Sequence, residues 1–133
     1  FAQLTQFVTD SLPHTPQLLV LGDFNVAPED RDVWDPSRVV NQILVSAPER
    51  AAFQTLLNQG LWDSFRVISE SSGQFSWWDY RRASFQRNRG LRIDHIVLSE
   101  ALKNHCINSY IDPSTRAWDR PSDHAPVVTT LVF

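Results

Sequence analysis

An apolar run that stops abruptly at an acid and an amide constrains this chain more than any other feature. Residues 18–21 are four consecutive aliphatic side chains, and the chain continues through Gly22 and Asp23 to Asn25. Such a run, bounded by a glycine, predicts a strand that is buried on both faces. If the chain stays extended beyond it, Asp23 and Asn25 point to the same side and leave the sheet edge together. We therefore expect the chemistry of the chain to gather at the end of this strand.

Helical and strand patterns alternate along the rest of the chain. Apolar residues at helical spacing predict helices over residues 1–11 and 49–58, and Gly60 is expected to end the second helix. Residues 26–38 predict a polar loop, and residues 61–66 a short amphipathic connector. The remaining predicted elements are strands over residues 75–78, 91–98, 107–110 and 125–133 and a short helix over residues 101–104. Strands separated by single helices indicate an α/β (α+β) layered fold with a mixed sheet.

The composition is that of a globular domain and excludes two classes of protein. Hydrophobic residues make up 42% of the 133 residues, and no apolar run approaches the ~20 residues that span a bilayer. The net charge of -3 does not resemble that of a dedicated nucleic-acid-binding domain. The first residues form no basic leader, and the lone Cys106 fits a reducing compartment, so we expect a cytoplasmic protein that does not engage a membrane.

Positive charge is concentrated in one stretch. Five of the eleven arginines fall between Arg81 and Arg92. The charge alone is compatible with a solvated loop and with a loop that faces an anion. In the strand predicted over residues 91–98, alternation places Arg92 and Asp94 on the face opposite to Leu91.

Three short polar clusters adjoin predicted strand ends. These are Asp23 with Asn25, Asp94 with His95, and Asp123 with His124. A carboxylate in an otherwise apolar strand costs free energy unless a metal, a cation or a histidine N–H compensates it. Oxygen donors with one or two histidines and no cysteine partner suit a hard cation such as Mg²⁺ or Mn²⁺ rather than structural zinc.

Four motifs between residue 21 and residue 126 resemble those of a known family. They are residues 21–28 (LGDFNVAP), 76–81 (SWWDYR), 88–96 (NRGLRIDHI) and 122–126 (SDHAP). In this order they resemble the C-terminal half of the exonuclease III family, the abasic-site endonucleases of the endonuclease/exonuclease/phosphatase superfamily. The resemblance implies one layer of the four-layered α/β-sandwich of the DNase I-like fold. It also implies a DNA-repair nuclease that cleaves on the 5′ side of abasic sites and acts as a 3′→5′ exodeoxyribonuclease.

The resemblance implies a role for each residue that matches a motif. Asp23 matches the Asp that acts on the attacking water or on the leaving oxygen, and Asn25 the amide that contacts the scissile phosphate. Asp94 matches the carboxylate that holds the catalytic histidine, which is His124. Asp123 matches a metal-associated Asp, so the implied metal ligands are Asp23, Asn25 and Asp123, with Mg²⁺ or Mn²⁺ as the cofactor.

The resemblance, together with the local charge, also implies a DNA-binding surface. Its residues are Trp77, Asn88, Leu91, Ile93, Arg81 and Arg92. In the family, the positions of Trp77, Leu91 and Ile93 form an apolar pocket that receives a flipped-out abasic sugar, and Asn88 matches an amide that contacts phosphate. Because an abasic site has already lost its base, extruding it costs little free energy. The expected partner is double-stranded DNA with abasic sites or 3′ ends, in contact with the nucleoid if the source is bacterial.

The family domain is close to twice the length of this chain. Its N-terminal half supplies an Asn, a Tyr and the Glu that is the principal metal ligand, and residues 1–133 match only its C-terminal part, so the N-terminal half is expected to be absent. Half of a sandwich exposes an apolar sheet face, so we expect self-association through that face or binding of the missing half. Two alternatives stay open: a catalytically incompetent half-domain that acts as a binding or structural module, and a superfamily phosphoesterase with another substrate.

Overall fold

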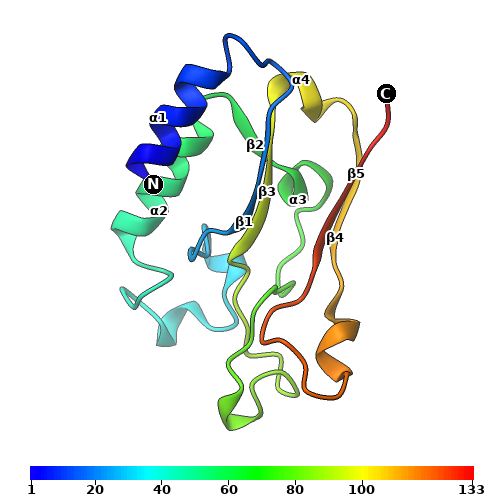
Figure 1. Ribbon diagram of the computed structural model, residues 1–133. Coiled ribbons are helices and arrows are strands. Elements are labelled where there is room, and N and C mark those ends of the chain that lie inside the picture. Colours follow the sequence, from blue (N-terminus) through cyan, green and yellow to red (C-terminus); the bar gives the residue numbers. More distant parts are fainter.

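The computed structural model describes residues 1–133 and contains two antiparallel β-sheets surrounded by helices (Figure 1). The larger sheet has the strand order β1-β3-β2, with β1 at Leu19–Asp23, β3 at Asp94–Ser99 and β2 at Leu61–Asp63. The smaller sheet pairs β4 (Cys106–Ile111) with β5 (Val127–Leu131). The α/β class expected from the sequence is confirmed. All strand pairs are antiparallel, where the sequence suggested a mixed sheet.

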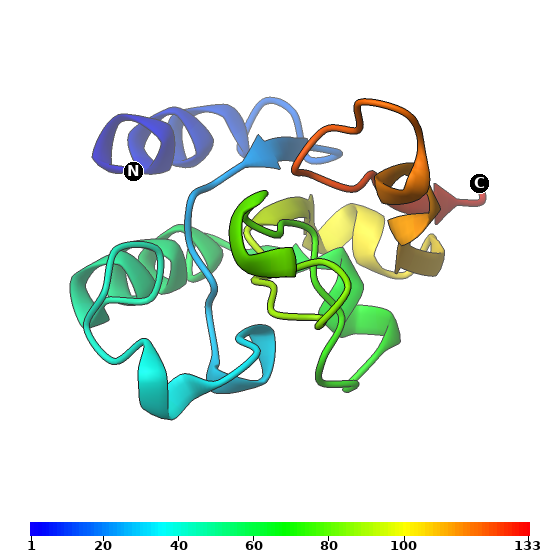
Figure 2. The ribbon, with the colours of Figure 1, turned by 90° about the horizontal axis from the view of Figure 1, so that it is seen from below.

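Two longer helices lie side by side along one face of the larger sheet (Figures 1 and 2). These are α1 (Ala2–Ser11) and α2 (Ala47–Leu57), both of which the sequence predicted. The other helical elements are α3 (Ser64–Ile68), α4 (Glu100–Lys103), and the 3-10 turns η1 (Asp30–Asp32), η2 (Pro36–Arg38), η3 (Arg81–Ala83) and η4 (Pro113–Ala117). None of these helices combines the length and hydrophobicity that crossing a bilayer requires.

The main core lies between the larger sheet and the two long helices. Val8 of α1 and Phe53 of α2 pack against Val97 of β3, and all three side chains are buried. Their burial fixes the helices on this face because aliphatic and aromatic side chains gain free energy when they leave water. On the other side, α3 contacts β3 of the larger sheet and β4 of the smaller one, so it joins the two sheets.

Strand β1 is not the doubly buried strand that the sequence predicted. It lies at the edge of the larger sheet and pairs only with β3, and Leu21 is 65% exposed. A hydrophobic run indicates a strand but does not tell whether neighbouring elements cover both of its faces. Leu21 and Asp23 lie on one face, and Val20 and Gly22 on the other.

Three other segments differ from the expectation. Residues 61–66 form strand β2 and the start of α3 instead of a connector. The expected polar loop over residues 26–38 contains four buried side chains: Val26, Ala27, Asp32 and Val33. The strand predicted over residues 75–78 is reduced to isolated bridges from Trp77 to Leu91 and to His124. The loops that carry residues 79–90 and 112–124 gather at the lower end of Figure 1.

Candidate active site

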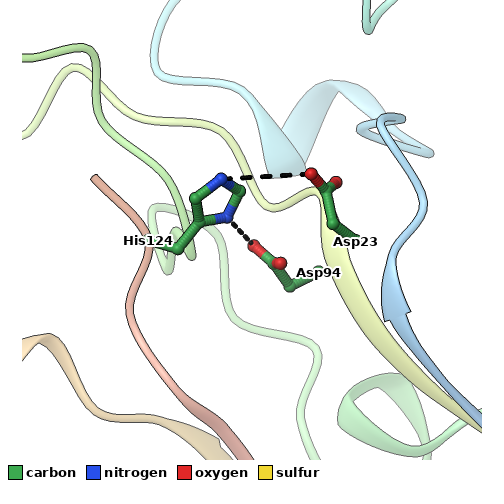
Figure 3. Close-up of side chains that lie close together, drawn as sticks. All are labelled: Asp23, Asp94 and His124. Atoms are coloured by element: carbon green, nitrogen blue, oxygen red, sulfur yellow. Dashed lines mark hydrogen bonds and ion pairs between the residues drawn. The ribbon is translucent and has the colours of Figure 1, made fainter. Parts of the chain in front are cut away.

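Asp23, Asp94 and His124 come together at one end of the larger sheet (Figure 3). Asp23 is the last residue of β1 and Asp94 the first residue of β3, and the two are direct partners in the antiparallel register. Directly opposed residues of an antiparallel pair point to the same face, so both carboxylates leave the sheet on one side. His124 reaches them from the segment between η4 and β5. The sequence expectation that these three residues converge is consistent with this geometry.

The imidazole of His124 lies between the two carboxylates. Its Nδ1 is 2.9 Å from Oδ2 of Asp94, and its Nε2 is 3.9 Å from Oδ2 of Asp23. An ionised carboxylate only accepts hydrogen bonds, so Nδ1 carries the proton and its N–H donates a hydrogen bond to Asp94. This contact leaves Nε2, the nitrogen on the open side, as the one that can meet a substrate.

Asp94 is held by its backbone as well as by His124. The backbone N–H groups of Ile93 and Asp94 both donate to Oγ of Ser76, each at 3.0 Å. Burial raises the pKa of Asp94, and the hydrogen bond from His124 opposes that shift without cancelling it. Ser76 was not singled out in the sequence, because a serine between aromatic residues carries no signal of such a contact.

The segment that carries His124 is pinned to residues 76–78. The N–H of Trp78 donates to the carbonyl of Asp123 at 3.0 Å, and the N–H of Ala125 to the carbonyl of Ser76 at 2.7 Å. Nε1 of Trp77 donates to Oδ2 of Asp123 at 2.9 Å. These bonds fix the position of the imidazole, since it is attached to the residue between the two anchored neighbours.

The three side chains of the cluster can hold a divalent cation. One potential ligand atom from each of Asp23, Asp94 and His124 lies within 4.8 Å of the others. Carboxylate oxygens are the donors that hard divalent cations prefer. Asp123, which the sequence placed with the metal, is not part of this cluster, and Oδ2 of its carboxylate accepts the Trp77 indole N–H.

Asn25 does not continue the extended strand, contrary to the expectation from the sequence. Its φ is 53°, in the left-handed region, and its backbone N–H donates to Oδ1 of Asp23 at 2.8 Å. Asparagine tolerates this conformation better than most residues, and the bond forms a tight turn. The turn fixes one oxygen of the Asp23 carboxylate and leaves the Asn25 side chain exposed.

His95 does not share the site with Asp94, although the two are adjacent in sequence. Its side chain is buried on the opposite face of β3, where Nε2 lies 2.8 Å from the carbonyl of Val26 and Nδ1 lies 3.1 Å from the Arg92 guanidinium. The carbonyl can only accept and the guanidinium can only donate, so the proton is on Nε2 and the ring is neutral. Burial, with Arg92 next to it, lowers the pKa of His95 to about 4.

The prediction that Arg92 binds DNA is wrong, because its side chain is buried. Its side chain is 1% exposed and bonds to two buried carboxylates, Asp32 Oδ1 and Asp63 Oδ2, each at 2.7 Å. Arg66 also pairs with Asp32. Burial by itself raises the pKa of Asp32, but Arg92 and Arg66 outweigh it and hold that pKa below its usual value. A buried arginine needs such partners, and they come from segments remote in sequence.

The other residues expected at the DNA have different environments. Ile93 is 2% exposed and belongs to the core, so it does not form a surface pocket. Leu91 and Trp77 line a pocket at the surface. Arg81 lines the same pocket and is paired with Asp79, and Asn88 accepts the indole N–H of Trp78 at 3.1 Å. Arg81 and Asn88, both expected at the DNA, are thus engaged in contacts within the chain.

The sequence profile of the Endonuclease/Exonuclease/phosphatase family matches residues 1–124 of the chain. The chain is 38% identical to exodeoxyribonuclease III of Haemophilus influenzae over 134 residues, which cover 96% of the chain and 50% of that protein. It is 39% identical to an exodeoxyribonuclease of Bacillus subtilis over 111 residues, which cover 83% of the chain and 42% of that protein. The chain thus spans about half the length of these relatives.

Solved structures of similar proteins share the fold. The 3′ phosphatase NExo from Neisseria, bound to a product DNA hairpin, superposes with a TM-score of 0.97 at 45% identity, covering 99% of this chain and 51% of NExo. An AP endonuclease from Archaeoglobus fulgidus superposes with a TM-score of 0.84 at 29% identity, covering 97% of this chain and 52% of that protein.

Proposed function

Because this chain belongs to the endonuclease/exonuclease/phosphatase family, we propose that it carries part of the active site of a metal-dependent DNA-repair nuclease. The observation that carries the proposal is the position of the His124 imidazole, 2.9 Å from Asp94 and 3.9 Å from Asp23. The activities named for its relatives, exodeoxyribonuclease III, 3′ phosphatase and AP endonuclease, support phosphoester hydrolysis on DNA. We assign residues 1–133 to the C-terminal part of a family domain.

The reaction we propose is hydrolysis of a phosphodiester on the 5′ side of an abasic site, together with 3′→5′ removal of nucleotides. Asp94 accepts a hydrogen bond from Nδ1–H of His124 and stabilises the ring when Nε2 is protonated as well, so that Nε2–H can donate to a phosphate oxygen. Asp23 lies beside Nε2 and exchanges a proton with the attacking water or with the leaving 3′-oxygen. The exposed Asn25 amide is close in sequence to Asp23 and donates to the phosphate.

The residues present fit a divalent cation in part. Asp23 supplies a carboxylate at the open side of the cluster, and Asn25 follows it within one turn. We propose Mg²⁺ or Mn²⁺, which when bound neutralises charge that develops on the phosphate. Asp23 and Asp94 are the two carboxylates of the cluster, so the chain offers few carboxylates to the ion. The Glu implied by the family resemblance is expected to complete the site from the other half of the domain.

An exposed leucine beside the cluster supports a proposal for how that half binds. Leu21 is 65% exposed and lies on the same face of the sheet as Asp23 and Asp94. We propose that this face packs against the remaining half of a family domain or, without it, against a second copy of the chain. Size-exclusion chromatography with light scattering tests this: a Leu21→Ser variant that stays as large as the parent assembly contradicts it.

The substrate is tested by offering four compounds to the purified protein in Mg²⁺. These are a duplex with an abasic site, a duplex with a recessed 3′ end, a duplex with a 3′-phosphate, and a small aryl phosphodiester. Cleavage of the DNA substrates with little turnover of the small ester supports a repair nuclease. The reverse preference indicates a phosphoesterase with another substrate. We propose separately that the nuclease acts in the cytoplasm, at the nucleoid if the source is bacterial.

A binding module without catalysis is the alternative that the half-length match favours. The melting temperature of the protein, measured with increasing Mg²⁺, distinguishes this alternative from the nuclease. A competent site raises the melting temperature with increasing Mg²⁺ because the ion binds the folded state. The Asp23→Ala variant must lose this rise. An unchanged melting temperature in the parent protein, with DNA still bound, favours the module.

A further inference from the structure

Arg116 is a buried cation without a carboxylate partner. It lies in η4, is 7% exposed, and has no carboxylate oxygen within 4.0 Å of its guanidinium. Arg92, the other buried arginine, is bonded to Asp32 and Asp63. The Nε atom of Arg116 is also buried and has no hydrogen-bond partner in the protein. Burying a cation with so few partners costs free energy, so the stability of the fold does not by itself account for Arg116.

Two aromatic rings and one backbone carbonyl hold this guanidinium instead. Its central carbon lies 5.3 Å from the centre of the Tyr80 ring and 5.2 Å from the centre of the Phe85 ring. Its Nη1 donates to the carbonyl of Ser122. A planar guanidinium can contact aromatic faces and still donate hydrogen bonds in its own plane. The Arg116 side chain therefore connects the loop of residues 79–90 with the loop of residues 112–124, which lie at the same end of the molecule (Figure 1).

The carbonyl that Arg116 binds belongs to the residue two positions before His124. In the preceding peptide, the carbonyl of Pro121 accepts the Tyr80 hydroxyl at 2.8 Å. The side chain of Ser122 also takes part, because its Oγ accepts the backbone N–H of His124 at 3.1 Å. Ser122 thus links Arg116 to the backbone of His124. A change in the direction of the Ser122 peptide would therefore move the imidazole.

The backbone before His124 is held at three successive carbonyls. The carbonyls of residues 121, 122 and 123 accept hydrogen bonds from Tyr80, Arg116 and Trp78, in that order. The chain turns just before this segment, since Arg120 has a φ of 49°, in the left-handed region. Arg116 reaches across that turn. A functional side chain keeps its geometry only when the residues around it are held by such supporting contacts.

We propose that Arg116, together with the Tyr80 hydroxyl, positions His124. The two side chains fix the peptides before the histidine, so that its imidazole keeps the Nδ1–H bond to Asp94. The proposal rests on the proposed nuclease function for its effect on turnover, but the position of the imidazole can be measured without catalysis. The sequence did not single out Arg116, because an arginine in a loop gives no sign of the rings and the carbonyl that surround it.

The experiment determines the tautomer of His124 by long-range ¹H–¹⁵N NMR of protein labelled in its histidine rings, at about pH 8.5, where an ordinary histidine is neutral. The spectrum distinguishes a ring with its proton on Nδ1 from a ring that exchanges between both tautomers. A His124→Gln variant assigns the signal among the four histidines. Arg116→Met removes the charge and the donors, and Arg116→Lys keeps a charge and a donor. Arg120→Met is the matched control, since Arg120 is an exposed arginine of the same loop.

We expect the parent protein, Arg116→Lys and Arg120→Met to carry the His124 proton on Nδ1. Arg116→Met should show a mixture of the two tautomers. Its kcat on DNA should fall by about tenfold or more with little change in KM, because a displaced imidazole lowers the rate rather than the affinity. The proposal is overturned if Arg116→Met has the same tautomer as Arg120→Met. It is also overturned if Arg116→Lys loses as much as Arg116→Met, since the bond to Ser122 would then not matter.

A second variant serves if circular dichroism shows that Arg116→Met does not fold. Tyr80→Phe removes only the hydroxyl of an exposed ring and frees the Pro121 carbonyl. It should also give a mixture of tautomers, and an unchanged tautomer overturns the proposal.

The tautomer and the turnover separate the two proposals. If Arg116→Met loses the fixed tautomer while the parent protein hydrolyses no DNA, the proposed nuclease function fails and the positioning role of Arg116 stands. If the parent protein hydrolyses DNA and Arg116→Met keeps both the tautomer and kcat, only the positioning role fails.

Discussion

The carboxylate of Asp94 lies 2.9 Å from Nδ1 of His124, although the two residues are 30 positions apart in sequence. This contact fixes the tautomer of the imidazole and directs Nε2 toward the open side of the cluster, where Asp23 lies. The contact depends on the start of β3 and on the segment after η4 being held together through Ser76 and Trp77. Replacing Asp94, or the residues Ser76 and Trp77 that hold these segments together, should therefore lower kcat more than it weakens DNA binding.

Replacing Asp94 by Asn tests the tautomer directly. An amide can present its N–H₂ group to the ring, so Nδ1 no longer has to carry the proton. We expect kcat on DNA to fall by about 100-fold or more, as loss of a positioned acid or base does, with an unchanged dissociation constant for DNA. Asp10→Asn, an exposed substitution in α1, is the control. An Asp94→Asn protein with the kcat of the control contradicts the role of this contact.

Replacing Arg92 by Met should destabilise the fold rather than weaken DNA binding. The substitution leaves Asp32 and Asp63 buried with fewer positive partners, which costs about 3–5 kcal/mol when one partner of a buried pair is removed. Urea unfolding measures the loss. Arg87→Met, at an exposed position, should change stability by no more than about 0.5 kcal/mol. Equal unfolding midpoints for the two variants would show that the network is not stabilising.

His95 should make the fold sensitive to acid. Its pKa is about 4 in the folded protein, where burial and Arg92 disfavour the charged ring, against a reference value of 6.5. Between these two pH values the unfolded chain binds a proton that the folded chain does not. The contribution of His95 to the free energy of unfolding is therefore fully present above pH 6.5 and is lost as the pH falls toward about 4. The full difference corresponds to about 3 kcal/mol.

The control for this pH dependence is His95→Gln. Glutamine can donate to the Val26 carbonyl and accept from Arg92, and it does not titrate. Besides Arg92, the charged group that faces His95 most closely is Asp63, at 3.8 Å. Urea unfolding between pH 7 and pH 4 should show a smaller loss for the variant than for the parent. Parallel curves for the two proteins would assign the acid sensitivity to carboxylates instead.

The two adjacent tryptophans provide a matched pair of substitutions. Trp77→Phe and Trp78→Phe each remove one indole N–H, which binds Asp123 in the first case and Asn88 in the second. We expect Trp77→Phe to lower kcat by about tenfold, because the freed Asp123 no longer fixes the segment of His124. Trp78→Phe should mainly lower stability, because Trp78 is buried between aromatic rings. Similar kcat values for the two variants contradict a positioning role for Trp77.

Short-range patterns in the sequence predicted the two long helices and the presence of strands β1 and β3, although the bounds of both strands differ from the predicted ones. Asp23 and Asp94 were identifiable because each interrupts or ends an apolar run, which is an unfavourable place for a charge without a partner. The grouping with His124 followed from the resemblance of four motifs to one family. The structure supports that grouping by geometry, while the role of each residue stays a prediction.

The structure differs from the sequence predictions where segments remote in sequence determine the environment of a residue. Arg92 was expected at the surface, since nothing near it in sequence reveals that Asp32 and Asp63 provide buried counter-charges. Strand β2 has three residues, too few to show a period, and its pairing with β3 defines it. The exposure of Leu21 depends on what covers the sheet, which local sequence does not encode.

The most direct test of the central claim is incision of a duplex with a single abasic site in the presence of Mg²⁺. The protein is measured alone and with the N-terminal half of a relative added, and an Asp23→Ala/His124→Ala double variant serves as the control for contaminating nuclease. We predict cleavage on the 5′ side of the abasic site in at least one of the two conditions and none by the double variant. Two results would contradict an active site built on Asp23, Asp94 and His124. One is no cleavage by the parent protein, either alone or with the N-terminal half added, and the other is equal cleavage by the parent protein and the double variant.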